Sequence, residues 1–338
     1  MTPPQEASDF TRALDALCTT HLGGPMSECA RLSGGASQES YRFACGGEIF
    51  VLRRPPGGIA KTTSSAALSM TDEAHTLARV YAAGVAVPQV VHICAPEDAL
   101  GLGYIMRFIE GQTIARKILR DDDFANMRPE LAAQCGTMLA RLHALETHDM
   151  AGLPSSDAKG ELDKYTEILR AHGHPHPVFE LAIKWLADNV PPSQARCLVH
   201  GDFRMGNLMV APEKGVVAIL DWELAHIGDP MEDLGWPCVP SWRFGQHQNP
   251  VGGFGQRGDF YAAYEAAGGT IDRAAVRFWE ILGTLKWGIM CTMMATAFTS
   301  GADRTVERAA IGRRASETEI DLLRMLEGQD KFPDVKGN

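Results

Sequence analysis

The sequence predicts an α+β fold in which a small, mostly antiparallel sheet with one helix is followed by a larger and mostly helical part. Strand-like alternation and β-branched apolar residues occur at residues 31–43, 48–53, 89–93 and 102–109. Further along the chain, apolar residues recur at helical spacing, most clearly from Leu131 to Leu145. Strands gathered in one half and helices in the other are typical of the α+β class.

The first two predicted strands are separated by a glycine-containing loop. Residues 31–43 alternate in polarity but are interrupted by the turn-forming sequence Ser33-Gly34-Gly35-Ala36-Ser37. A third strand is expected at 48–53, and Pro55 and Pro56 end it because proline cannot donate a ladder hydrogen bond. The expected order is therefore strand, Gly loop, strand and strand.

Helices and one further pair of strands complete the prediction. An amphipathic helix around residues 10–17 is expected to precede the sheet, and the helix that accompanies the sheet is predicted at 71–83, with Thr71 as its N-cap. In the helical part, two short apolar runs at 197–199 and 216–220 bracket charged and Gly-containing turns. We expect these two runs to pair as a hairpin laid on helices.

Composition and charge are those of a soluble globular protein. Of the 338 residues, 45% are apolar and 22% are charged, and the formal net charge is -10. Proteins that bind a nucleic-acid backbone need clustered Lys and Arg, so nucleic acid is not an expected partner. The N-terminal segment has no basic region followed by an uninterrupted apolar stretch. We therefore expect neither a secretion signal nor a transit peptide, and the predicted location is cytoplasmic.

Cysteines, histidines and the longest apolar segment do not indicate a metal cluster or a membrane span. The eight cysteines are scattered, without the C-x-x-C spacing of zinc or redox sites, and we expect them to be reduced. The alternating His172, His174 and His176 have no cysteine or carboxylate close in sequence and are interpreted as an exposed loop. Residues 278–298 are apolar but include two charged side chains, which favours a core helix. The oligomeric state is not predicted.

The strongest chemical signal lies in residues 200–207, His-Gly-Asp-Phe-Arg-Met-Gly-Asn, and in Asp221, which follows an apolar run. Phosphoryl transfer needs a carboxylate that orients the attacking hydroxyl and accepts its proton, and oxygen ligands that hold Mg²⁺. Asp202 fits the first role, and Asn207 and Asp221 fit the second. Taken singly, Asp202 and Asn207 could equally be turn residues. Their combined spacing between apolar runs favours phosphoryl transfer.

With these motifs the sequence resembles the aminoglycoside phosphotransferase and choline kinase-like family, and within it the branch related to the kinase domains associated with acyl-CoA dehydrogenases. The resemblance is carried by LVHGDFRMGNLMV and AILDWELAHIGDPMEDLGW. It implies a protein-kinase-like two-lobed fold, with a nucleotide-binding lobe at 1–108 and a catalytic, substrate-binding helical lobe at 109–338. It also implies Asp202 as catalytic base, Asn207 and Asp221 as Mg²⁺ ligands, and ATP as the phosphoryl donor.

The resemblance implies that the Gly loop covers the bound nucleotide as a lid. Glycine allows backbone N–H groups to come close to phosphates. From the sequence alone, a Gly-Gly turn between strands is more often a plain hairpin. The lid residues expected to contact the nucleotide are Ser33, Gly34, Gly35 and Ser37.

Further nucleotide-binding positions follow from the same resemblance. Arg53 and Glu73 stand where a phosphate-pairing cation and its helix glutamate are expected, but arginine departs from the usual lysine, and its planar fork is not equivalent to a point charge. A surface ion pair and a solvated helix face remain open for these two residues. Met106, Arg107 and Ile109 are expected in the segment that joins the lobes, where a plain buried strand is also compatible.

Three more residues are expected to support the site from outside it. Asp229 and Asp233 in the segment GDPMEDL resemble residues that brace the catalytic loop. His200 is interpreted as an orienting core histidine rather than as an acid or base.

The acceptor is predicted to be a small alcohol. Only seven residues separate Asp221 from Asp229, which leaves no room for the long peptide-docking segment of protein kinases. The Met- and Trp-containing segment 278–298 could accommodate an acyl chain or be a plain core helix. The resemblance favours a hydroxyacyl compound or its CoA thioester. The candidate contacts to the substrate or the transferred phosphate are Arg204, Glu223 and Trp287.

Two alternatives remain open. The first is an aminoglycoside or choline-type kinase, for which an acidic wall would be needed; the net charge of -10 permits such a wall without locating it. The second belongs to another class, a nucleotide-binding regulatory pseudokinase, and is motivated by Arg53.

Overall fold

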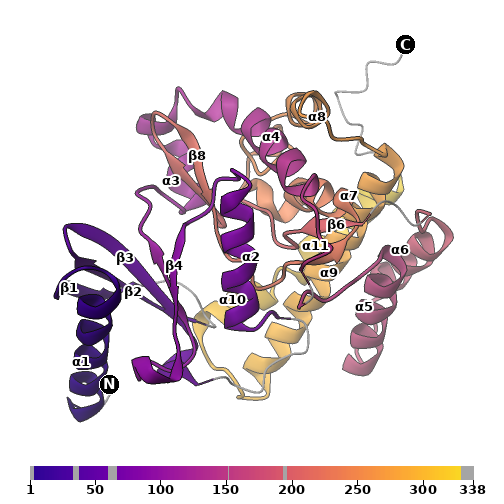
Figure 1. The fold of residues 1–338 in the computed structure, drawn as a ribbon. Helices are drawn as coiled ribbons and strands as arrows, with labels where there is room; N and C mark the ends of the chain where they lie inside the picture. The colour runs from indigo at the N-terminus through magenta and orange to yellow at the C-terminus, as the bar shows by residue number, and fades with distance from the viewer. Residues whose placement is uncertain (1–3, 33–37, 60–66, 151, 193–195, 329–338) are drawn as a thin grey trace. The chain divides into compact units, whose positions relative to one another are not determined.

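The computed structural model describes residues 4–32, 38–59, 67–150, 152–192 and 196–328, and every structural statement below concerns these residues (Figure 1). The predicted fold class is confirmed, because an antiparallel sheet occupies the N-terminal part and most of the remainder is helical.

The chain packs as two compact units. The first unit comprises Met1–Gly111 together with the later segments His148–Pro154 and Val217–Ala225, and the second unit comprises the rest of the chain. The functional division into lobes at 1–108 and 109–338 stays a prediction.

The first unit contains a five-stranded sheet in the order β1-β2-β3-β5-β4, and each neighbouring pair is antiparallel. Two α-helices and two short 3-10 helices accompany the sheet. The elements are α1 (Pro4–His21), β1 (Met26–Arg31), β2 (Glu39–Cys45), β3 (Glu48–Arg54), η1 (Pro56–Gly58), α2 (Met70–Ala82), β4 (Val90–Ile93), η2 (Pro96–Asp98) and β5 (Tyr104–Arg107).

Successive side chains of β3 point to opposite faces of the sheet, and each face packs against a different helix. Phe50 and Leu52 are buried in one cluster with Leu14 and Leu17 of α1. Because successive strand residues point to opposite faces, Arg53 lies on the other face. There its guanidinium approaches α2, which also contacts β4 and β5. The sheet thus separates its apolar contacts with α1 from the charged position that faces α2.

The helix α2 begins one residue earlier than predicted. Ser69 is its N-cap, because the Ser69 Oγ accepts a hydrogen bond from the Asp72 N–H at 3.1 Å. The assignment of Thr71 as N-cap is therefore wrong. Serine and threonine have similar capping preferences, so the sequence alone did not separate the two positions.

The second unit is mainly helical. Its elements are α3 (Ala115–Arg120), η3 (Asp122–Phe124), η4 (Arg128–Glu130), α4 (Leu131–His143), α5 (Ala158–His172), α6 (Pro177–Asp188), β6 (Cys197–Val199), β7 (Leu208–Ala211), β9 (His226–Gly228), α7 (Pro230–Gly235), η5 (Trp236–Cys238), η6 (Pro240–Arg243), α8 (Arg257–Ala266), α9 (Arg273–Thr299), α10 (Val306–Gly312) and α11 (Ala315–Leu326). The strand β8 (Gly215–Ile219) begins in this unit and ends in the first.

The predicted hairpin between residues 197–199 and 216–220 is wrong. The strand β6 pairs antiparallel with β9, with Cys197 opposite Gly228, and β8 pairs with β7. Both short apolar runs are strands, but their partners lie at other places in the sequence. The consequence is that the loop after β6 is not the turn of a hairpin and is free to carry functional side chains.

The long helix α9 forms much of the core of the second unit. By length and composition alone it could cross a membrane, but the core helices of soluble proteins can be equally long and apolar. Half of its most apolar stretch is buried inside the protein. It packs against α5, α6, α7, α10 and α11. Glu280 in α9 is 1% exposed and pairs with Arg257 at 2.6 Å and with Arg243 at 3.3 Å. These contacts support the predicted core helix.

Close packing of α4 on α8 gives the first testable prediction. A Cβ atom at Gly136 would lie 2.2 Å from the carbonyl oxygen of Phe260, so we expect Gly136→Ala to destabilise the protein by about 1–3 kcal/mol. The matched control is Gly258→Ala on the exposed side of α8, where no atom lies within 4 Å of the added Cβ. This control should be neutral or stabilise by about 0.4–1 kcal/mol, because alanine reduces the freedom of the unfolded chain.

Urea unfolding of the two variants measures both effects. Equal stabilities for Gly136→Ala and Gly258→Ala would contradict the close approach of the two helices.

Candidate active site

Residues 200–207 form the loop between β6 and β7 and are called the catalytic loop below. Phe203 and Met205 are fully buried. Asp202 and Arg204, which alternate with them, keep 17% and 28% of their side-chain surface exposed. The alternation thus anchors the loop by its apolar residues and leaves its charged residues accessible.

A buried carboxylate holds the beginning of this loop. Asp233 of α7 accepts hydrogen bonds from the backbone N–H of His200 at 2.7 Å and of Gly201 at 3.0 Å. The His143 Nε2 lies 3.3 Å from the same carboxylate. Burial would raise the pKa of Asp233, but the hydrogen bond and charge of His143 and the N–H of His200 hold it below its ordinary value. The prediction that Asp233 braces the catalytic loop is confirmed.

Asp229 has a different role from the one predicted. Its carboxylate accepts hydrogen bonds from the Met231 N–H at 2.9 Å and from the indole N–H of Trp279 at 2.9 Å. It therefore caps α7 and ties this helix to α9, and these contacts do not involve the catalytic loop.

His200 is an orienting core residue, as predicted. Its side chain is fully buried, and its Nδ1 accepts a hydrogen bond from the backbone N–H of Asp202 at 3.2 Å. This contact fixes the backbone next to the candidate base.

The Asp202 carboxylate has a donor on each oxygen. Its Oδ1 accepts from the Arg204 Nε at 3.0 Å and from the Trp236 Nε1 at 2.7 Å. Its Oδ2 accepts from the Asn207 Nδ2 at 2.6 Å. These contacts hold the carboxylate in one orientation, as a positioned proton acceptor requires.

The side chain of Asn207 is oriented by the same loop. Its Nδ2 donates both to the Asp202 Oδ2 and to the Asp202 carbonyl oxygen, the latter at 2.9 Å. Because the amide nitrogen is used twice, the amide oxygen is the atom left to act as a ligand. A hard cation such as Mg²⁺ prefers oxygen ligands of this kind.

Asp221 lies in the first unit, two residues after the end of β8. Its backbone has a φ of +66°, a left-handed conformation that is uncommon for residues other than glycine but is more often tolerated by aspartate. Its Oδ1 accepts a hydrogen bond from the Arg53 Nη2 at 2.6 Å, and 36% of its side chain is exposed. The carboxylate can therefore offer its other oxygen to a cation.

Arg53 is surrounded by carboxylates. Besides Asp221, the Arg53 Nε lies 3.4 Å from the Glu73 Oε1, and its Nη2 lies 3.9 Å from the Glu223 Oε2. Burial would lower the pKa of Arg53, but the negative charges around it raise that pKa above its ordinary value. The guanidinium therefore remains a cation.

Glu73 is 1% exposed and accepts a hydrogen bond from the Tyr104 hydroxyl at 3.1 Å. Burial raises the pKa of Glu73, and the charge of Arg53 opposes this effect. In place of the surface pair and solvated helix face left open by the sequence, the structure shows a buried pair. The Glu73 Oε2 has no hydrogen-bond donor among the described residues.

The structure divides the predicted site residues into two groups. Arg53, Glu73, Asp221 and Glu223 lie together in the first unit, and Asp202, Arg204 and Asn207 lie together in the second. Glu223 is within ion-pair distance of Arg53, so its observed contact belongs to the group in the first unit.

The structure does not test the remaining nucleotide-binding predictions. Ser33, Gly34, Gly35 and Ser37 lie outside the described residues. The backbone N–H of Arg107 already donates to the Gln89 carbonyl oxygen at 2.9 Å, while Met106 pairs with Val51 in the sheet and Ile109 follows β5. The binding roles of these seven positions stay predictions.

An aromatic cluster beside Asp202 was not predicted. The Trp242 ring lies 5.4 Å from the Trp236 ring and 4.8 Å from that of Trp287, measured between centroids. The Arg204 guanidinium stacks over Trp242 at 4.7 Å. The Nε1 atoms of Trp242 and Trp287 are buried and have no acceptor among the described residues. The cluster comes from α9 and two 3-10 helices, which sequence spacing does not bring together.

Each of the two groups contains an oxygen ligand that suits a magnesium ion chemically. Asn207 in the second unit offers an amide oxygen and Asp221 in the first unit offers a carboxylate oxygen, and Mg²⁺ binds hard ligands of both types together with phosphate oxygens and water.

Comparison with known proteins places these features in a family. The sequence profile of the "Phosphotransferase enzyme family" matches residues 28–279. Mouse acyl-CoA dehydrogenase family member 10 is 30% identical over 250 residues, which cover 71% of this chain and 22% of that protein. The chain thus spans about a fifth of the length of this relative.

Solved structures share the fold. A candidate aminoglycoside phosphotransferase from Ralstonia eutropha is 21% identical with a TM-score of 0.77, over 94% of this chain and 98% of that one. A spectinomycin phosphotransferase, solved with ADP and spectinomycin, is 12% identical with a TM-score of 0.66, over 93% and 98% of the two chains.

The carboxylates around Arg53 give a second prediction. Arg53→Met leaves Glu73 buried without its cation, so we expect a loss of about 3–5 kcal/mol in the free energy of unfolding. Adding Glu73→Gln should recover part of this loss, because the orphaned charge is removed with it.

Arg12→Met provides the control, because the Arg12 side chain is 75% exposed and pairs with the exposed Asp9 at the surface. Its removal should cost less than about 1 kcal/mol in chemical unfolding. A similar small effect for Arg53→Met would contradict the buried role of the arginine.

The third prediction concerns pH and Asp233. Its pKa is lower in the folded protein than the ordinary aspartate value, so its stabilising contribution is present above about pH 4 and is lost as pH falls below that value. The free energy of unfolding should therefore be higher for the wild type than for Asp233→Asn. This difference should be largest at about pH 6–7 and should shrink toward about pH 3.

Asp163→Asn, which removes an exposed carboxylate of α5, should show a small difference over the same range. A wild-type advantage over Asp233→Asn that stays constant down to about pH 3 would rule out this linkage.

Proposed function

The chain belongs to the phosphotransferase enzyme family, and from this premise we propose that it is an ATP- and Mg²⁺-dependent kinase for the hydroxyl group of a hydroxyacyl compound or its CoA thioester. Family membership supports phosphoryl transfer to a small alcohol. The observation that carries the proposal is the oriented Asp202 carboxylate, held on both oxygens by Arg204, Trp236 and Asn207.

In the proposed reaction, Asp202 acts as the proton acceptor. The acceptor hydroxyl oxygen forms a bond to the terminal phosphorus of ATP, the bond from that phosphorus to the bridging oxygen breaks, and ADP leaves. The hydroxyl proton passes to the Asp202 carboxylate. Positioning of the carboxylate supplies much of the advantage, because the base need not be ordered during the reaction.

The proposal gives Mg²⁺ oxygen ligands from Asn207 and Asp221. When bound, the ion neutralises charge on the nucleotide phosphates. The chain's own contribution is to orient these ligands. The Asn207 amide is fixed by its two hydrogen bonds to Asp202, and the Asp221 carboxylate is fixed by Arg53.

Arg53 is proposed to link the metal ligand to the nucleotide phosphates. Its contact with Asp221 and its burial beside Glu73 support this role, because the cation is held in place before nucleotide binds. Solved structures of the same fold contain ADP or GDP, which supports a nucleoside triphosphate as the phosphoryl donor.

The aromatic cluster favours an acceptor rich in oxygen atoms over a cationic one. Each of its rings already has a protein cation over it, since Lys286 lies 5.3 Å from the Trp236 ring, Arg204 lies 4.7 Å from Trp242, and Arg314 lies 5.8 Å from Trp287. An ammonium group of choline or an aminoglycoside would compete with these cations for the same rings.

The indole nitrogens point to the same class of acceptor. The N–H groups of Trp242 and Trp287 are buried donors, and a buried donor without an acceptor is costly. In the proposal, an acyl compound that shifts these rings would satisfy the two donors with its carbonyl, thioester or carboxylate oxygens. The likeness to an acyl-CoA dehydrogenase family member supports the same substrate class.

The fourth prediction tests this function by ATP turnover with Mg²⁺ over hydroxyacyl-CoAs of several chain lengths, aminoglycosides, choline and sugars. We expect turnover with hydroxyacyl-CoA, none when EDTA is present, and a kcat lower by ~10²–10⁴-fold in Asp202→Asn with ATP affinity retained. Asp188→Asn, which changes an exposed carboxylate of α6, should keep full activity.

Other outcomes would assign the protein differently. Turnover of an aminoglycoside or choline but not of hydroxyacyl-CoA would overturn the substrate and favour the other kinase types. Binding of ATP without turnover of any compound would favour a regulatory pseudokinase, for which Arg53 in place of lysine is the motivating observation.

A further inference from the structure

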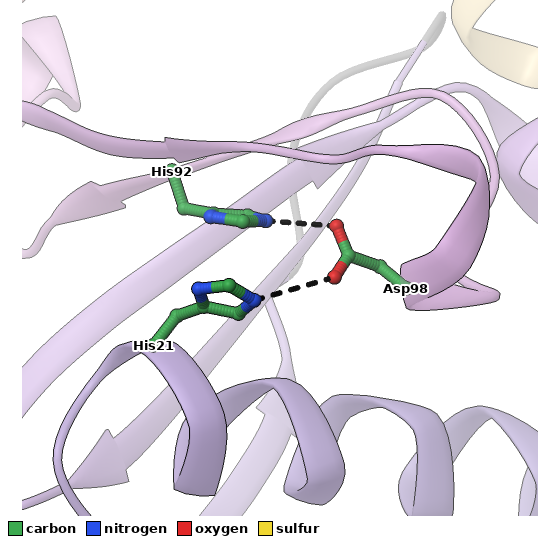
Figure 2. Close-up of side chains that lie close together, drawn as sticks. All are labelled: His21, His92 and Asp98. Atoms are coloured by element: carbon green, nitrogen blue, oxygen red, sulfur yellow. Dashed lines mark hydrogen bonds and ion pairs between the residues drawn. The ribbon is translucent and has the colours of Figure 1, made fainter.

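Two histidines and an aspartate with no role assigned above converge in the first unit. Figure 2 shows His21 at the end of α1, His92 on β4 and Asp98 at the end of η2, with both rings directed at one carboxylate. The His92 Nε2 lies 2.8 Å from the Asp98 Oδ2, and the His21 Nε2 lies 4.0 Å from the Asp98 Oδ1. The three candidate ligand atoms all lie within 4.8 Å of one another.

These separations suit a shared ion. Zinc binds histidine nitrogen and carboxylate oxygen at ~2.0–2.2 Å, so two of its ligands in a tetrahedral site are roughly 3.3 Å apart. The observed distances of 2.8 Å and 4.0 Å lie on either side of this value. A small movement of the His21 side chain, which is 44% exposed, would bring its nitrogen closer.

The carboxylate is held ready for such an ion. Asp98 is 5% exposed at its side chain, and its Oδ2 also accepts a hydrogen bond from the Ala95 N–H at 2.7 Å. The rings of His21 and His92 lie 4.6 Å apart with an interplanar angle of 35°. The backbone contact fixes the carboxylate, and the ring contact keeps the two imidazoles side by side.

The protonation states of the neighbouring groups leave one carboxylate and two imidazoles as the candidate ligands. Cys94 is nearby, but burial and the charge of Asp98 raise the pKa of its thiol to about 12, so it stays protonated. The pKa of Asp98 is held below its ordinary value, because hydrogen bonds from His92 and Ala95 outweigh the effect of burial. The aspartate is therefore ionised near neutral pH.

We propose that His21, His92 and Asp98 bind one Zn²⁺ ion, with solvent completing the coordination on the exposed side of His21. Two imidazole nitrogens and one carboxylate oxygen suit zinc, whereas Mg²⁺ and Ca²⁺ select sites built from oxygen alone. The ion joins three segments that are separate in sequence, α1, β4 and η2. Its role is to fasten the N-terminal helix to the sheet of the first unit.

The fifth prediction is tested with the full chain, stripped of metal by a chelator and dialysed near pH 7.5. Titration calorimetry should give one Zn²⁺ per chain at this site, and Co²⁺ should produce visible absorption bands of a bound ion that Zn²⁺ then displaces. Zn²⁺ should also raise Tm, because the ion binds the folded chain.

The variants are His21→Gln and His92→Gln, which leave the Ala95–Asp98 contact intact. Losing one of three ligands should weaken Zn²⁺ binding by at least ~100-fold, since even changes to groups that only support a ligand cost 10–100-fold. The matched control is His174→Ala in the second unit, whose ring forms a similar pair with His172 at 5.4 Å, and it should bind as wild type does.

Circular dichroism and Tm without metal check that each variant is folded. Zn²⁺ affinity and Co²⁺ spectra unchanged in His21→Gln and His92→Gln would show adventitious binding elsewhere and overturn the proposal. Absence of Zn²⁺ binding to the wild type would overturn it as well, and would leave the cluster as a histidine–carboxylate ion pair.

Discussion

The catalytic loop depends on one buried carboxylate. Asp233 has no exposed surface, yet it carries a negative charge, and it can do so because the N–H groups of His200 and Gly201 and the His143 side chain all point at it. A buried charge without such partners would cost several kcal/mol. Since two of these donors belong to the backbone of the catalytic loop, the same contacts that pay for burial also fix where Asp202 stands.

The first unit uses charge in a similar way around Arg53. Here one cation lies among several carboxylates, and its guanidinium contacts both Glu73 and Asp221 and so fixes their relative positions. The forked shape of arginine is suited to this task, because it donates in two directions where a lysine ammonium acts as a point charge. The departure from lysine is therefore accompanied by a set of partners that uses the geometry of arginine.

Local patterns predicted much of the fold and part of the candidate site. The strands β2, β3, β4 and β5 and the helix α2 followed from the residue pattern with errors of one or two residues at their ends, and for α2 the reason is that capping residues such as Ser69 and Thr71 are nearly interchangeable. The strand β1 was expected at the start of residues 31–43 and lies almost entirely before them. The pairing of β6 with β9 and of β7 with β8 did not follow, because strand pairing depends on contacts between distant segments. The Trp236–Trp242–Trp287 cluster was missed for the same reason.

The sequence by itself determined the reaction class of this protein. The residue types and spacing of Asp202, Asn207 and Asp221 indicate phosphoryl transfer, because the side chains expected as base and metal ligands stand in two short segments of the chain. Only the tertiary structure decided how these groups are oriented, since the donors that fix them come from the catalytic loop itself, from η5 and from β3. It also decided that His21, His92 and Asp98 meet, because burial and ring contacts between three separate segments are properties of the packed chain.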